Sequence, residues 1–109
     1  MDAAGVVVAL AALAQDVRLA LFRLLVRAGP AGMPAGRIAE ALAVPNSSLS
    51  FHLAQLTQAG LIRQQRQGRS LVYSADYAAM NALVGYLMEN CCQGSGDPAN
   101  TSVTEGKCS

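Results

Sequence analysis

The chain has 109 residues, of which 52% are hydrophobic and only 14% are charged. This length supports one domain with one core, and so much apolar surface in a short chain favours a homodimer. No stretch reaches the ~18 apolar residues that a membrane span needs, and the apolar start carries Asp2 and no basic residue, unlike a secretory signal. We therefore expect no membrane partner, and a cytoplasmic protein with reduced thiols.

The charge is unevenly distributed along the chain. The formal net charge is +1, but the stretch from Arg18 to Ala75 holds seven arginines and a single acid, Glu40, a local net charge of +6. Both flanking segments are acidic. A basic middle between acidic ends favours a nucleic-acid partner.

Two helices are predicted in the first third of the chain. Residues 3–13 are apolar on nearly every side, which predicts a buried helix at a dimer interface. Asp16 is the expected N-cap of a second helix that runs to about Ala28 with apolar residues at the helical period. Gly29 and Pro30 end that helix.

The middle of the chain predicts two short helices joined by a tight turn. Pro34 suits the first turn of a helix over residues 35–43. Pro45 restricts the connection, and Asn46 is the expected cap of the next helix, over about residues 47–58, which Gly60 ends.

A hairpin and a last helix follow. Residues 61–66 and 70–74 are predicted strands joined at Gln67-Gly68-Arg69. Asp76 is the expected cap of a helix that extends to about Cys92, and Cys91 would continue its apolar stripe. Residues 1–92 are thus the predicted folded domain, and residues 93–109 a flexible Gly/Ser-rich tail that carries a third thiol.

Two short helices followed by a hairpin predict a mainly α fold with a β-hairpin, namely a winged helix-turn-helix that binds double-stranded DNA. The second helix would read the major groove, and the arginines would grip phosphates or a minor groove. A winged helix that contacts only proteins is the alternative. The candidate DNA-binding residues are Asn46, Ser47, Ser48, Ser50, Phe51, His52, Gln55, Arg66, Arg69, Arg18 and Arg37.

These segments resemble the ArsR/SmtB family, dimeric winged-helix repressors of bacterial metal-resistance operons. The likeness covers about residues 8–92, and its most specific parts are Asn46 to Leu56, Ala59 to Ile62, Arg66 to Arg69, and Tyr73. The resemblance implies a homodimeric repressor that binds a palindromic operator. It implies no catalytic activity and no required cofactor.

Two sensor sites of that family are absent here. The helix before the reading helix has no paired cysteines, and the last helix has Asp76 without an accompanying His. The vicinal pair Cys91-Cys92 instead resembles an arsenic-responsive sub-group that uses C-terminal cysteines together with a tail cysteine, here Cys108. The resemblance implies As(III) as the effector, with Sb(III) as a second candidate.

The chemistry of the three cysteines agrees with that implication. Soft thiolates select thiophilic ions, and a three-sulfur pyramid suits trivalent arsenic. Adjacent helical residues point ~100° apart, so both sulfurs can bind one ion only if the helix ends or turns at Cys92. Cys108 lies sixteen residues further on, and such a tail has an r.m.s. span of roughly 20–24 Å, enough to return.

Other roles for the thiols remain open. Redox or persulfide sensing through a disulfide is one alternative, and cadmium or lead binding is another. A packing role for Cys91 would leave Cys92 unexplained. A thiol–disulfide enzyme is disfavoured because the thiols are not arranged as Cys-X-X-Cys and have no accompanying base.

Overall fold

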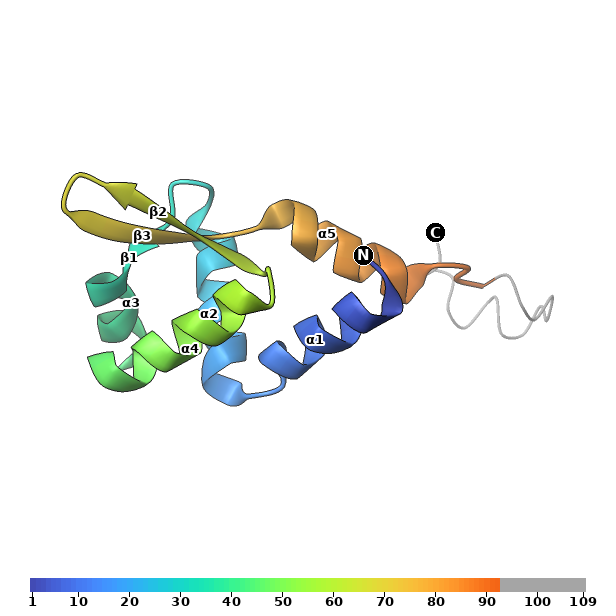
Figure 1. The fold of residues 1–109 in the computed structure, drawn as a ribbon, viewed down its shortest axis with the longest axis horizontal. Helices are drawn as coiled ribbons and strands as arrows, with labels where there is room; N and C mark the ends of the chain where they lie inside the picture. The colour runs from blue at the N-terminus through green and yellow to red at the C-terminus, as the bar shows by residue number, and fades with distance from the viewer. Residues whose placement is uncertain (93–109) are drawn as a thin grey trace.

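The computed structural model of the chain describes residues 1–92, which form five helices and a three-stranded antiparallel sheet (Figure 1). The predicted fold, mainly α with a β-hairpin, is confirmed. The elements in chain order are α1 (Ala3–Leu13), α2 (Asp16–Ala28), β1 (Met33–Pro34), α3 (Ala35–Leu42), α4 (Asn46–Gln58), β2 (Ile62–Gln67), β3 (Ser70–Ala75) and α5 (Tyr77–Met88).

The core lies where α2 meets α3, α4 and the start of the hairpin. Its largest fully buried side chains are Leu21, Leu25, Ile38, Leu49, Leu56 and Leu61. Burying each such side chain contributes about 1.5–3 kcal/mol. The helical spacing of the apolar residues therefore predicted the inner faces of α2 and α4 correctly.

Two predicted helix caps are wrong. Asp16 is already helical, and Gln15 is the N-cap of α2, its side chain accepting a hydrogen bond from the Arg18 backbone N–H at 2.9 Å. Asn46 is the first residue of α4, because Pro45 takes the cap position with an extended backbone and no side-chain bond. The predicted cap of α5 is confirmed, since the Asp76 carboxylate accepts from the Ala79 N–H at 3.0 Å.

The short strand β1 was not predicted. Met33 and Pro34 pair with Tyr73 and Val72 of β3, giving the sheet order β1-β3-β2. Pro34 therefore precedes α3 and is not part of its first turn. Gly32 permits this pairing, because its φ is 74° and a Cβ there would collide with the Tyr73 carbonyl.

Helix α5 ends four residues earlier than predicted. Its last residue is Met88, and Glu89 has an extended backbone. Asn90 then adopts a left-handed conformation, with φ of 61°, as does Cys92, with φ of 66°. Asn tolerates this conformation at the position after a helix cap. Cys91 therefore does not continue the apolar stripe of α5.

Helices α1 and α5 contact each other at the end of the molecule opposite the hairpin tip (Figure 1). Both helices leave large apolar side chains exposed, namely Val7, Val8 and Leu10 on α1, and Val84, Leu87 and Met88 on α5. No helix among residues 1–92 is by itself long and apolar enough to cross a membrane, and α1 with α2 meets that test only as a pair bent by 103°.

Candidate nucleic-acid interface

A tight turn between α3 and α4 orients α4 on the protein surface. Ala43 has a φ of 55° and ends α3, the Val44 N–H donates to the Ala39 carbonyl at 3.2 Å, and Pro45 fixes the entry into α4. The three leucines of α4, Leu49, Leu53 and Leu56, are buried. The opposite face of α4 is left to solvent.

The exposed face of α4 contains no acid. Its exposed members include four of the predicted DNA-binding residues, Ser47, Ser48, Ser50 and Phe51. Phe51 is 57% exposed, which is unusual for an aromatic side chain. Serine hydroxyls bond phosphates or base edges, and an apolar ring contacts thymine methyl groups. This face therefore has the chemistry of a major-groove reader.

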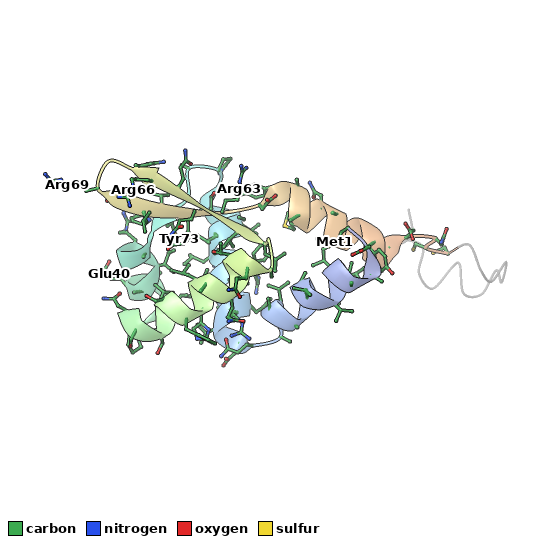
Figure 2. The ribbon with its side chains drawn as sticks, in the orientation of Figure 1. Met1, Glu40, Arg63, Arg66, Arg69 and Tyr73 are labelled. Carbon is green, nitrogen blue, oxygen red and sulfur yellow. The ribbon has the colours of Figure 1, made fainter. Side chains whose placement is uncertain are left out.

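The hairpin of β2 and β3 forms the wing. Gln67 pairs with Ser70, so the turn contains only Gly68 and Arg69, and Gly68 has the φ of 64° that a two-residue hairpin turn needs. Arg66 and Arg69 are both exposed. Figure 2 shows Arg69 projecting at the tip, with Arg66 beside it at the same end of the wing. Two guanidinium groups thus lie where the wing extends furthest from the core.

A groove of about 300 Å³ separates α4 from the wing, and it is lined by Ser50, Leu53, Ala54, Thr57, Gln58, Gln64 and Tyr73. The Gln64 amide donates to the Tyr73 hydroxyl at 2.9 Å, which fixes both polar groups on adjacent strands. Gln58 and Gln64 were not among the residues predicted from the sequence. The helical period could have indicated Gln58, because it lies seven residues after Phe51 and therefore on the same face of the helix.

Three other predicted residues lie on the opposite side of α4, toward α1. Arg18 and Gln55 line a second groove between these two helices, of about 560 Å³, and His52 is half-buried beside them. The Arg18 Nε donates to the Ala12 carbonyl at 2.7 Å, and its Nη1 lies 3.4 Å from His52 Nδ1. Arg18 therefore links α1 to α4 within the protein, and its predicted bond to phosphate stays a prediction.

The remaining predicted DNA contacts are exposed but lie outside the centre of this surface. Asn46 begins α4, and its carbonyl accepts a bond from the Ser50 hydroxyl at 3.1 Å. Arg37 is exposed on α3. Both stay predictions.

The segment after α5, which carries Cys91 and Cys92, lies far from α4 and the wing (Figure 1). Cys91 and Cys92 are exposed, and their sulfurs are 3.4 Å apart. Within residues 1–92 no three His, Cys, Asp or Glu side chains cluster as metal ligands. Cys108, the third predicted ligand, lies outside the described residues.

Known proteins are similar to this chain in sequence and in fold. A family model described as a helix-turn-helix domain matches residues 13–65. The HTH-type transcriptional regulator YgaV of Escherichia coli (strain K12) is 31% identical over 83 residues, which cover 76% of this chain and 82% of that protein.

Solved structures with a similar fold are also transcriptional regulators. An ArsR-like transcriptional regulator from Rhodococcus sp. RHA1 superposes with a TM-score of 0.73 at 24% identity, over 95% of this chain and 93% of that one. The homodimeric winged helix-turn-helix DNA-binding domain of Mb0332 from Mycobacterium bovis, a possible ArsR-family transcriptional regulator, has a TM-score of 0.62 and 26% identity. That superposition covers 85% of this chain and 86% of that one.

Proposed function

The chain belongs to the ArsR family of helix-turn-helix transcriptional regulators, and from that premise we propose that it is a homodimeric operator-binding repressor that trivalent arsenic releases from DNA. The cysteines after α5 are the arsenic ligands in this proposal. The 3.4 Å contact between the Cys91 and Cys92 sulfurs carries the effector assignment.

The exposed face of α4 supports operator binding. Its serines and Phe51 are open to solvent, and the wing arginines lie at the same end of the molecule. The centres of two half-sites one helical turn apart are about 34 Å from each other, and a two-fold dimer matches a palindrome of that spacing. Each subunit therefore presents one α4 and one wing to one half-site.

The apolar surface of α1 and α5 supports the homodimer. Helices α1 and α5 contact each other and expose Val7, Val8, Val84 and Leu87, and exposed apolar side chains in such number favour a protein interface. The Mycobacterium bovis relative is itself homodimeric. A two-fold interface between these helices pairs the same residues from both subunits.

The early end of α5 supports the metalloid site. Continuous helix would point the two thiols ~100° apart, whereas the turn at Asn90 brings the sulfurs into contact. Two soft sulfurs with no His beside them favour a thiophilic ion over a hard one. Cys108 is the proposed third ligand, completing a three-sulfur pyramid around As(III) or Sb(III).

The position of this site explains how binding would reach the DNA. It directly follows α5, which contacts α1, so an ion that reorders the chain after Met88 acts on the proposed dimer interface. A change in that interface alters the spacing of the two α4 helices. A coupling of about 1–3 kcal/mol lowers operator affinity by about 5–150-fold.

A mobility-shift titration against the DNA upstream of the gene tests this proposal. The protein is titrated with and without arsenite, and then with cadmium and with peroxide in separate arms. Cys91→Ser and Cys92→Ser are expected to keep full operator affinity and to lose release by arsenite, whereas Cys108→Ser should have a smaller effect. Glu89→Gln, beside the pair, is the matched control and should be released like the unmodified chain.

The titration also separates the alternatives. A complex that resists arsenite but dissociates with peroxide overturns the metalloid assignment in favour of thiol oxidation, which the proximity of the two sulfurs also allows. Release by cadmium alone would instead identify a soft-metal sensor. Normal arsenite release of Cys91→Ser would show that the ligands are elsewhere.

A further inference from the structure

We propose that Arg18 is a positioning residue for DNA binding, which holds the His52 imidazole as the neutral tautomer that carries its proton on Nε2. That Nε2–H then donates to a phosphate oxygen of the operator. The inference rests on the proposed operator binding and adds to it a named atom of α4 and the residue that orients it.

Arg18 is held in place by contacts on three sides. The Gln15 side chain accepts from its backbone N–H at 2.9 Å, and its Nε donates to the Ala12 carbonyl, near the end of α1, at 2.7 Å. These bonds leave its Nη1 directed at His52 Nδ1, 3.4 Å away. The guanidinium is therefore a bridge from α1 to α4.

In the proposal, that bridge places the ring proton of His52 on Nε2, since the direction of a bond between the two nitrogens depends on the tautomer. A guanidinium has five donors and no acceptor, so the contact requires a lone pair on Nδ1. The one ring proton of the neutral imidazole then occupies Nε2. A proton on Nδ1 would place two hydrogen-bond donors, Nη1 and Nδ1, against each other.

A second neighbour restricts the ring. Phe51 packs edge-on against the His52 ring, with centroids 5.7 Å apart and an angle of 67° between the planes. His52 is half-buried, so it retains a solvent-facing side. Contacts from Arg18 and Phe51 therefore hold the ring, and in the proposal its other nitrogen, Nε2, is the atom that meets the phosphate.

A fixed donor on the reading helix has a defined use. Polar side chains and N–H groups bond phosphate oxygens to set the register of a protein on the duplex, and these bonds do not read the sequence. An imidazole that exchanges between tautomers would present this donor for only part of the time. Loss of the Arg18 contact should thus weaken binding to different operators about equally.

The first test is the protonation pattern of His52, measured in the free protein by long-range proton–nitrogen NMR at pH 7.5. His52 is the single histidine of the chain, so its signals are unambiguous. Nδ1 should appear unprotonated in the unmodified chain and in Arg23→Met, an exposed arginine on the same helix. Arg18→Met should give a mixture of tautomers. A proton on Nδ1 of the unmodified chain would overturn the proposal even if no variant folds.

The second test is a double-substitution cycle on operator affinity. Arg18→Met should weaken binding about tenfold, the range for one hydrogen bond to a charged acceptor. In a His52→Ala background the same change should cost almost nothing more. The proposal is contradicted if the double variant loses affinity by the product of the two single losses. It is also contradicted if Arg18→Met binds the operator with normal affinity. Failure of the unmodified chain to bind its operator would instead refute the proposed function, leaving the NMR result standing.

Discussion

Phe51 illustrates how single side chains distinguish a binding surface from a core. It lies on α4 among serines, and it is one of the chain's two phenylalanines. The other, Phe22, is buried, whereas Phe51 is mostly in solvent. Its place among the serines of α4 supports the proposed contact between this ring and DNA.

Phe51→Ala is therefore expected to separate binding from stability. Operator affinity should fall about tenfold, as for loss of one good base contact, because the ring would no longer pack on a thymine methyl group. The thermal midpoint should stay within a degree or two, since little core burial is lost. Fluorescence anisotropy and thermal unfolding measure the two effects. Leu19→Ala, another exposed apolar residue, is the control, and an equal loss of affinity there would contradict the assignment.

The wing shows how an element places charge. Its strands pair from Ile62 with Ala75 to Gln67 with Ser70, so the hairpin is rigid up to its two-residue turn. This pairing carries Arg66 and Arg69 to the exposed tip of the wing. Their proposed contribution is electrostatic and sensitive to salt.

Replacing the wing arginines should change the salt dependence of operator binding. Each phosphate contact contributes about −0.9 to the slope of log affinity against log salt concentration. Arg66→Ala and Arg69→Ala should each reduce the slope by about one and weaken binding similarly on all operators. Arg27→Ala, an exposed arginine near the end of α2, should leave the slope unchanged. A wing variant with an unaltered slope would exclude a phosphate contact.

At the scale of the whole molecule, the two proposed sites lie at opposite ends. Helix α4 and the wing tip lie at one end, and α1, α5 and the segment after α5 lie at the other (Figure 1). Helix α2 lies between them and contacts α1, α4 and β3. In the proposed mechanism, an event at the cysteine end affects DNA binding through these packed helices.

Leu87→Glu tests the proposed dimer surface. This side chain is 59% exposed on α5, and a charge there would be buried without a partner in the dimer. Sedimentation equilibrium should show monomers at micromolar concentration, and operator affinity should fall by at least tenfold, because the two half-sites would no longer be bound together. Leu71→Glu, on the wing, should remain dimeric. A dimeric Leu87→Glu protein would place the interface elsewhere.

The sequence by itself determined the elements whose cause is local. The leucines of α2 and α4 repeat at the helical period, Asp76 caps α5 through a bond three residues away, and Gly68 supplies the turn of the wing. These structural predictions succeeded because neighbouring residues settle them. The same period placed the serines and Phe51 on the exposed face of α4, and their contact with DNA stays a prediction.

Only the tertiary structure decided the features that join distant residues. Strand β1 pairs with residues about forty positions further on, and Arg18 meets His52 thirty-four positions away. A contact between distant residues leaves no periodic trace in the sequence, because neither side chain restricts its own neighbours. The end of α5 is an exception, because its cause is local: Asn90 adopts a left-handed conformation. The apolar stripe had instead predicted a helix that continues to about Cys92. That early end brings the sulfurs of Cys91 and Cys92, on which the proposed sensing depends, into contact.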